Sequence, residues 1–519
     1  MPRPLFATLF LLAATLRAAP EIRVAEIAAP APANAVGVSL APAPDGALWL
    51  SWLEPLATPA SSTALRYAKL DPAAEKWSAP RTVASGADWF SGTADFPALT
   101  IGPDGTIAAC WYVNNPSSAA TAHLHHGAGY RTLVSLSRDG GATWSTPATL
   151  SRESIAVEFV SLATLADGRV LAAWLDGRAK HAAPPPAPGA KAGHAAGPRQ
   201  QLYARVVGSD GPDTLVDASV CDCCQTTLTA FPDGTALLAY RGRSDEEARD
   251  IRVTRFRGRE WDDPRTLNND DWRIAACPVN GPQLASDGGR VGAAWFTAAD
   301  GKPRVLASFS PDAGARFLMP LRIDGGQPVG RVDTLILRDG ALLVTWVEAN
   351  GSLWLRRVTP DFALGEPVQL TRPQQGLVKG VPRLALRRDY AGGATSAQIA
   401  VAFTAEGSTG GVRTLLVTIP EGELIAAEKQ CDCAPTAAQL QGYAIRGSLA
   451  EKTPASGGVR VRHFEVPGIF ATGTRDFRVE PAVADALETG RQFLGRIERR
   501  DGAWWLYDVR VLAGPPRAP

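Results

Sequence analysis

An Asp-Gly pair followed by a short apolar run and an aromatic residue recurs along this chain. Five copies keep the same offset: Asp45-Gly46 to Trp52, Asp104-Gly105 to Trp111, Asp167-Gly168 to Trp174, Asp233-Gly234 to Tyr240 and Asp339-Gly340 to Trp346. Gly288-Gly289 to Trp295 is a near copy, and a degraded copy ends at Phe403. Self-similarity at a period of roughly 50–65 residues indicates a repeat fold.

Each repeat has room for about four short strands, here named a to d, so each unit is interpreted as one blade of an all-β propeller. The Asp-Gly pair then lies in the a–b turn and the aromatic residue ends strand b. The copies predict seven blades across residues 35–428, with a six-bladed ring containing one aberrant unit as the alternative. The segment Glu21–Ile27 is predicted to add an outer strand to the last blade and close the ring.

The two ends of the chain differ from the repeats. Arg3 followed by an apolar run from Leu5 to Leu16 is typical of a cleaved secretory signal, which predicts a periplasmic or secreted protein. Near the other end, hydrophobic and polar residues alternate without the repeat motif, which predicts a small OB-like β-barrel. The predicted division is a signal peptide at 1–19, a propeller at 20–429, a linker at 430–441 and the barrel at 442–512.

Charge and hydropathy exclude two classes of partner. The net charge is +1, which gives no electrostatic footprint for nucleic acid or an anionic membrane surface. Beyond the signal no apolar stretch is long enough to span a membrane.

The chain has seven cysteines, and most of them are clustered. Cys110 follows an apolar run beside Trp111 and is expected to be a buried thiol. Cys221, Cys223, Cys224 and Cys277 begin the first strands of adjacent blades and are expected to meet near the central channel. Disulfides and a soft Zn or Cu site are both open interpretations, since export permits the first and thiolates favour the second. Cys431 and Cys433 repeat the motif and could join the cluster.

The segment Ser137–Trp144 matches the pattern Ser-x-Asp-x-Gly-x-Thr-Trp, and Ser310–Phe317 matches it with Arg for Thr and Phe for Trp. This resembles the Asp-box, or BNR repeat, of sialidases and related propellers. The box is a structural turn between strands c and d. The resemblance implies an arginine-lined carboxylate site, a Tyr–Glu nucleophile and an Asp acid/base. The Arg-x-Pro context that usually precedes the first box occurs here only at Arg517 to Pro519, so the resemblance concerns architecture more than chemistry.

The C-terminal segments Val461–Gly468 and Phe477–Val479 resemble the small periplasmic copper-binding domains of copper efflux systems. Those domains bind Cu(I) through one His and two Met. His463 matches the His, but the Met positions fall on Gly473 and Arg475. The resemblance implies a retained barrel that has lost its copper site, with His463 on a surface strand, and a domain through which a protein partner could dock.

Strand order places the b–c and d–a connections on one face of the ring, where propeller sites usually lie. The residues of this face that could bind a ligand are Arg178, Arg241, Arg243, Asn280, Arg331 and Arg383. The candidate catalytic residues are Asp95, Glu158, Asp176 and Tyr240. Guanidinium groups grip carboxylates, and a carboxyl pair can hydrolyse a glycosidic bond.

The sequence therefore predicts an exported, sialidase-like propeller that binds a glycan or another acidic small ligand, with glycoside hydrolysis as an open extension. The alternatives are a non-enzymatic protein of metal handling and an interaction scaffold. His123, His125 and His126 are expected in a solvated loop rather than in a ligand set.

Overall fold

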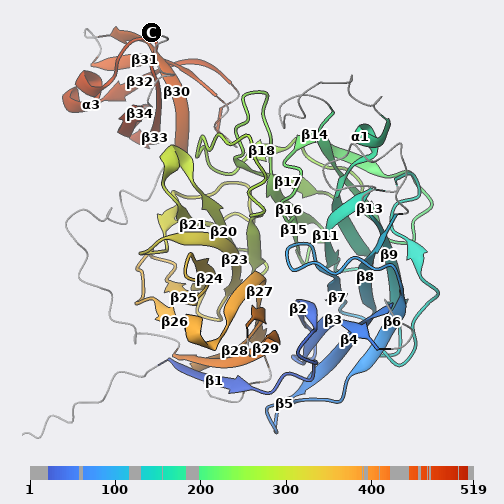
Figure 1. Ribbon diagram of the computed structural model, residues 1–519. Coiled ribbons are helices and arrows are strands. Elements are labelled where there is room, and N and C mark those ends of the chain that lie inside the picture. Colours follow the sequence, from blue (N-terminus) through green and yellow to red (C-terminus); the bar gives the residue numbers. More distant parts are fainter. Residues whose placement is uncertain are drawn as a thin grey trace, which may run out of the picture.

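In the computed structural model the chain forms a ring of β-sheets with a smaller barrel beside it (Figure 1). The structure describes residues 22–57, 62–115, 130–154, 156–182, 198–388, 390, 396–407, 410–420, 443–453, 457–464, 466, 469–470, 472–500 and 502–511. Five predictions lie outside these ranges: the signal peptide, the linker, the three loop histidines, Cys431 and Cys433.

Seven antiparallel sheets make up the ring, so the seven-bladed prediction is confirmed and the six-bladed alternative is wrong. Blade one contains β2 (Val36–Pro42), β3 (Leu48–Leu56), β4 (Ser62–Asp71), β5 (Lys76–Trp77) and β6 (Arg81–Ala87). Blade two contains β7 (Ala98–Ile101), β8 (Ile107–Asn114), β9 (Tyr130–Ser137) and β10 (Ala148–Thr149). Blade three contains β11 (Val157–Thr164), β12 (Val170–Asp176), β13 (Gln200–Val206) and β14 (Thr214–Val220). Blade four contains β15 (Thr227–Ala230), β16 (Ala236–Arg241), β17 (Ile251–Phe256) and β18 (Arg265–Thr266). Blade five contains β19 (Gln283–Ser286), β20 (Val291–Thr297), β21 (Arg304–Ser310) and β22 (Leu321–Arg322). Blade six contains β23 (Pro328–Ile336), β24 (Leu342–Glu348), β25 (Leu353–Val358) and β26 (Val368–Gln369).

The last blade closes the ring with both ends of the propeller segment. It contains β27 (Leu377–Arg387), β28 (Ser396–Glu406), β29 (Gly411–Pro420) and, as its outer strand, β1 (Arg23–Ile27). Strand β1 pairs antiparallel with β29, as the sequence predicted (Figure 1). Closure by a distant segment ties the last blade to the first and covers a strand edge.

The repeated aromatic residues are buried because each lies in the second strand of a blade, one to four residues before its end, and packs against a neighbouring sheet. These are Trp52, Trp111, Trp174, Tyr240, Trp295, Trp346 and Phe403, each at most 1% exposed. Hydrophobic clusters join consecutive blades, and one of them joins blade seven to blade one. The core is therefore distributed between the blades rather than around a single centre.

The first Asp-box is the structural turn that its sequence predicts. The Asp139 carboxylate accepts hydrogen bonds from the backbone N–H of Thr143 at 2.9 Å and from its hydroxyl at 2.6 Å. These bonds lower the pKa of Asp139 to about 2, the Thr143 hydroxyl having the largest effect. Trp144 packs edge-on against Tyr67 of the preceding blade. The turn thus links two blades.

The C-terminal strands form a closed barrel, which confirms the predicted second fold. Its elements are β30 (Tyr443–Thr453), β31 (Gly458–His463), β32 (Gly473–Val479), α3 (Pro481–Ala486), β33 (Gln492–Arg500) and β34 (Ala503–Val511). Arg446 forms an ion pair with Asp271 of the propeller at 2.9 Å. His463 is 3% exposed and packs against Phe470 and Phe477, so its predicted surface position is wrong: the ring lies on the inner side of the barrel wall.

Three short helical segments complete the described elements: α1 (Arg178–Ala182) and the 3₁₀ turns η1 (Ala299–Gly301) and η2 (Pro373–Gln375). Within the described ranges, no helix has the length and apolar character needed to cross a membrane.

Candidate functional site

A cavity of about 540 Å³ lies on the face that carries the b–c and d–a connections. We call it the mouth pocket. The segment between blades one and two supplies Phe90 and Asp95, and blade three supplies Glu158 and Phe159. The lining also includes Asn114, Tyr130, Cys223 and Val279. The pocket thus combines residues of the β6–β7, β14–β15 and β18–β19 connections with residues of strands β8, β9 and β11.

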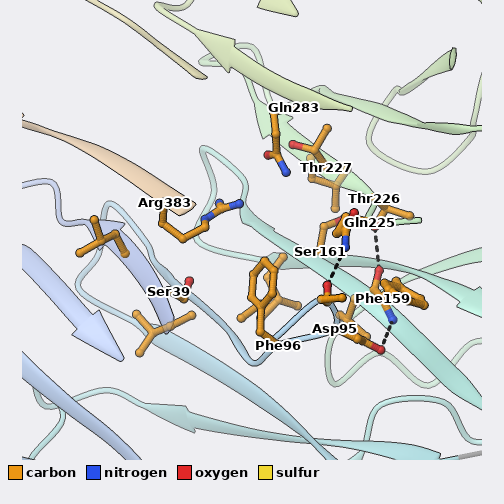
Figure 2. Close-up of a pocket in the computed structure, with 17 residues that line it drawn as sticks. Ser39, Asp95, Phe96, Phe159, Ser161, Gln225, Thr226, Thr227, Gln283 and Arg383 are labelled. Atoms are coloured by element: carbon orange, nitrogen blue, oxygen red, sulfur yellow. Dashed lines mark hydrogen bonds between the residues drawn. The ribbon is translucent and has the colours of Figure 1, made fainter. Parts of the chain in front are cut away.

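A second cavity, of about 100 Å³, occupies the central channel. Figure 2 shows Asp95 and Phe159 on one side of it and Arg383 across from them. Ala94, Asp95 and Phe159 line both cavities. Asp95 therefore lies at the boundary between the channel and the mouth pocket.

Asp95 is a buried carboxyl group of the mouth pocket whose pKa is raised. It is 4% exposed. Its Oδ2 accepts a hydrogen bond from the Tyr130 hydroxyl and one of 3.0 Å from the backbone N–H of Phe159. Burial raises the pKa of Asp95 to about 6, against the opposing effect of hydrogen bonds from Tyr130, Tyr112 and the Phe159 N–H. A carboxyl group with this pKa can exchange a proton near neutral pH.

Local backbone distortion gives Asp95 its backbone partner. Phe159 adopts a left-handed conformation with φ of 51°. The register of β11 against β12 shifts between Glu158 and Ser161 at the same place. Such bulges redirect backbone and side-chain groups next to sites, at a cost in local strain.

Aromatic rings and a second carboxylate form the rest of the wall. Phe90 and Tyr130 are stacked with their ring centroids 4.4 Å apart. Glu158 is 7% exposed, and Gln200 donates to its carboxylate at 3.4 Å. Among the described residues that line the mouth pocket there is no arginine or lysine. The pocket is therefore aromatic and acidic, which disfavours an anionic ligand.

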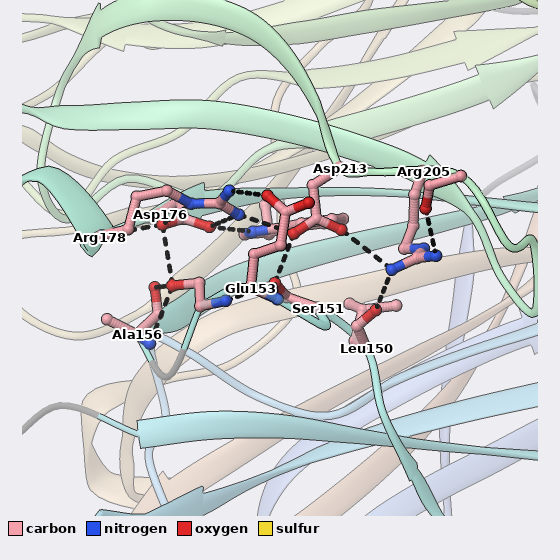
Figure 3. A network of polar contacts seen from close by, with 11 residues as sticks. Leu150, Ser151, Glu153, Ala156, Asp176, Arg178, Arg205 and Asp213 are labelled. Carbon is pink, nitrogen blue, oxygen red and sulfur yellow. Dashed lines mark hydrogen bonds and ion pairs between the residues drawn. The ribbon is translucent and has the colours of Figure 1, made fainter.

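Arg178 lies in an ion-pair network that includes two fully buried aspartates, drawn in Figure 3. Its guanidinium contacts Glu153 at 2.7 Å, Asp176 at 2.8 Å and Asp213 at 2.7 Å. Asp213 also pairs with Arg205 at 3.0 Å. With three carboxylate partners, the guanidinium is held within blade three.

Arg241 and Arg243 lie nearer the cysteines but are likewise engaged. Arg241 is 1% exposed and donates to the backbone carbonyls of Asn280 at 2.8 Å and Phe296 at 2.7 Å. Arg243 pairs with Asp222 and with a glutamate four residues further on. Arg178, Arg241 and Arg243 are therefore each held by partners of their own, and none of them lines the mouth pocket. Their binding of a ligand stays a prediction.

Two of the remaining predicted binding residues, Asn280 and Arg331, hold the segment that carries Cys277. The Asn280 side chain donates to the carbonyl of Val329 at 3.0 Å and accepts from the N–H of Arg331 at 2.7 Å. Arg331 donates to the carbonyl of Val279 at 2.6 Å. Arg383 lies on the channel, 3.7 Å from Asp333.

Asp176 belongs to a recurring structural contact of the blades. The indole N–H of Trp174 donates to Asp176 at 2.8 Å, two residues further on. Trp52 donates to Glu54 at 3.2 Å and Trp346 to Glu348 at 2.7 Å in the same way. This Trp-x-acid pattern was visible in the sequence, and it indicates that Asp176 stabilises its blade.

Tyr240, the other candidate catalytic residue of this region, is also held inside its blade. Its hydroxyl donates to Asp217 at 2.6 Å, and the residue is fully buried. Neither Asp176 nor Tyr240 is among the residues that line the mouth pocket.

The four predicted cysteines converge, as expected from their positions at the starts of adjacent blades. The Sγ atoms of Cys221, Cys223 and Cys224 all lie within 4.8 Å of one another. Cys277 packs against them, with its thiol in contact with that of Cys223. The Sγ atoms of Cys221 and Cys224 are 3.2 Å apart. Among the described cysteines no disulfide is formed, so that interpretation finds no support here.

Cationic groups surround this sulfur cluster. Arg249 donates to the Cys221 Sγ at 3.1 Å. Burial acts to raise the pKa of Cys221, but the thiols of Cys223 and Cys224 and the charge of Arg249 outweigh it and lower that pKa. Burial raises the pKa of Cys224. The cluster thus favours one thiolate shared among neighbouring thiols.

Sequence reasoning missed the aromatic wall of the mouth pocket. Tyr130 follows the insertion between β8 and β9, and Phe159 directly follows the candidate Glu158. The sequence shows that both residues are close to predicted connections, but nothing in it distinguishes them from the many aromatic residues of the core.

The barrel does not hold the residues that a copper site of the resembled type needs. His463 Nδ1 lies 2.8 Å from its neighbour's backbone oxygen. Gly473 and Arg475 occupy the two Met positions, and Arg475 stacks on Phe470. Because the chain's methionines are Met1 and Met319, neither of which is in this segment, no thioether is present to bind Cu(I) here.

A model of the BNR repeat-like domain matches residues 46–271. No curated protein sequence matches the chain. A lectin from Burkholderia pseudomallei is similar in structure, with a TM-score of 0.52, 12% identity, and coverage of 75% of this chain and 98% of that one. A protein of unknown function from Dyadobacter fermentans has a TM-score of 0.43, 14% identity, and coverage of 77% and 100%. A Hadza microbial sialidase has a TM-score of 0.37, 14% identity, and coverage of 60% and 63%.

The matched repeat domain and the seven sheets agree on a sialidase-like β-propeller. At 12% identity the likeness to the lectin shows the fold alone.

Proposed function

We propose that this protein binds a carbohydrate in the mouth pocket, and that the ligand is neutral rather than acidic. One observation carries this proposal: stacked Phe90 and Tyr130 lie in one cavity with the carboxyl groups of Asp95 and Glu158. Aromatic faces pack against the apolar faces of sugar rings, and carboxylates accept hydrogen bonds from hydroxyl groups. The resemblance to sialidases supports the carbohydrate class, while the lining charge argues against sialic acid.

Hydrolysis of a glycosidic bond is the second candidate activity. Asp95 has a pKa of about 6, and Tyr130 joins it directly. A carboxyl group with a raised pKa that shares a pocket with a second carboxyl group suits the division into general acid and nucleophile or base. An exported location follows from the N-terminal sequence and remains part of the proposal.

Binding is tested on an array of neutral and acidic oligosaccharides, followed by calorimetry on the best ligand. We expect Phe90→Ala and Glu158→Gln to weaken binding at least tenfold. Glu246→Gln, an exposed glutamate outside the pocket, is the matched control and should bind as wild type. Binding of acidic glycans only, or equal binding by all variants, would contradict the proposal.

Hydrolysis is tested separately with aryl glycosides. Release of the aryl group by wild type but not by Asp95→Asn would support a catalytic pocket. Binding without release would identify a lectin-like protein.

A further inference from the structure

The sulfur cluster has the arrangement of a metal site that the glycan pocket does not explain. Two connections supply it: residues 221–224 follow β14, and Cys277 precedes β19. Cys221, Cys223 and Cys224 are 0%, 3% and 1% exposed, so three thiols share a space from which water is excluded.

The sulfur separations suit a shared ion better than a disulfide. A disulfide needs a bond of about 2.05 Å, whereas Cys221 Sγ and Cys224 Sγ are 3.2 Å apart. Four sulfurs around Zn²⁺ at about 2.3 Å stand about 3.8 Å from one another. Three of the sulfurs already lie within 4.8 Å of each other, and Cys277 contacts Cys223.

The two connections are clamped together by contacts that do not involve sulfur. The N–H of Gly281 donates to the Gln225 side chain at 2.9 Å. A Cβ on Gly281 would stand 2.0 Å from the backbone oxygen of Gln225, so only glycine allows this approach. Arg241 and Arg331 hold the carbonyls of Asn280 and Val279 in the same segment. The sulfur positions are therefore fixed before any ion arrives.

The charges around the cluster match a thiolate site. Arg249 is 1% exposed and donates to the Cys221 sulfur at 3.1 Å. Buried thiolates carry negative charge that must be compensated, and outer groups of this kind orient and stabilise metal ligands. Cys223 also lines the mouth pocket, which gives an ion a path from solvent.

We propose that Cys221, Cys223, Cys224 and Cys277 form a thiolate site for a thiophilic ion of the Zn²⁺ or Cu⁺ class. A ligand set made only of sulfur selects such soft or borderline ions over Mg²⁺ and Ca²⁺. Each thiol that binds loses its proton to solvent, and no oxidation or reduction is required.

The test titrates reduced full-length protein with Zn²⁺ against a chromophoric chelator, and with Cu⁺ against a Cu⁺-specific competitor. We expect one ion per chain. Cys224→Ser and Cys277→Ser should each weaken binding at least tenfold, while Cys110→Ser, a buried cysteine outside the cluster, should bind as wild type. The ion that binds with the higher affinity in these two titrations is assigned to the site.

A second measurement uses wild-type protein, so its result does not depend on whether the cysteine variants fold. Co²⁺ added to wild type should give the intense ultraviolet absorption of cobalt–thiolate bonds, which Mg²⁺ should not displace and Zn²⁺ should. No ion bound by reduced wild type, no thiolate absorption, or equal affinity in Cys224→Ser, Cys277→Ser and wild type would overturn the proposal. Mass spectrometry showing a Cys221–Cys224 disulfide in protein purified without reductant would also overturn it.

Discussion

Replacing Asp95 by Asn should change how the stability of this protein depends on pH. The Asp95 carboxyl is buried and has a pKa of about 6, against 3.8 for an ordinary aspartate. It therefore binds its proton roughly a hundredfold more tightly in the folded protein than in the unfolded chain, which is worth about 3 kcal/mol.

The direction follows from which state holds the proton. The folded pKa lies above the unfolded one, so this stabilisation is fully present below about pH 4 and is lost as the pH rises through about 6. Between about pH 4.5 and about pH 8 the loss is about 2 kcal/mol, because the unfolded aspartate is already partly ionised at the lower value. Asparagine has no proton to lose and should not show this change.

An asparagine amide oxygen at the place of Oδ2 can keep the hydrogen bonds that this oxygen accepts from the Tyr130 hydroxyl and the Phe159 N–H. The assay unfolds wild type and Asp95→Asn with urea at the two pH values and monitors unfolding by tryptophan fluorescence. The free energy of unfolding of the variant minus that of wild type should be about 2 kcal/mol larger at the higher pH than at the lower one, because only wild type loses stability as the pH rises. Any fixed steric cost cancels in this comparison.

Asp71→Asn serves as the control. Backbone N–H groups of Ala74 and Ala73 lower the pKa of Asp71 below its ordinary value of 3.8, so its contribution to stability is lost only on acidification below about pH 4. Between about pH 4.5 and about pH 8 this variant should therefore keep the pH dependence of wild type. A change smaller than about 0.5 kcal/mol for Asp95→Asn, or one no larger than for Asp71→Asn, would refute the reasoning.

Two further substitutions test the described contacts. Arg178→Ala should lower the free energy of unfolding by roughly 3–5 kcal/mol, since the side chains of Asp176 and Asp213 are fully buried and would lose their shared cation. Thermal unfolding followed by circular dichroism measures this. Gly281→Ala should cost about 2 kcal/mol or more and weaken ion binding by the cysteines, because the new Cβ would meet the backbone oxygen of Gln225 at 2.0 Å.

Both substitutions have matched controls. Arg178→Lys keeps a charge at the carboxylates and should recover part of the loss. Gly289→Ala adds a methyl group where no atom lies within 4 Å and should leave both stability and ion binding near wild type. Equal effects of Gly281→Ala and Gly289→Ala would show that the close approach of the two cysteine connections is unimportant.

Much of the fold was predictable because the repeat is local. The Asp-Gly turn, the apolar strand and its final aromatic residue lie within eight residues, and every such aromatic residue is buried between blades. The blade number was harder to predict, since the last copy at Phe403 is degraded. The outer strand of that last blade is β1, which comes from the opposite end of the propeller segment and pairs with β29.

The candidate site was predictable only in part. The meeting of Cys221, Cys223, Cys224 and Cys277 followed from strand order, because both connections open onto the same face of adjacent blades. The partners of Arg178 and Arg241 did not follow from strand order, although both residues end a second strand or lie just beyond one. Arg178 turns to carboxylates and Arg241 to backbone carbonyls. A position in a connection fixes the face of the ring, but not the neighbour toward which a long side chain turns.

The sequence by itself determined the repeating sheets, the buried aromatic residues, the Asp-box turns and the face on which chemistry-bearing residues collect. All of these depend on short-range pattern and strand order. Only the tertiary structure decided that Asp95 and Glu158 share an aromatic pocket while Asp176 binds a tryptophan inside its blade. That choice depends on a left-handed residue at Phe159, a shifted strand register and the packing of neighbouring blades, none of which is encoded in the spacing of residues along the chain.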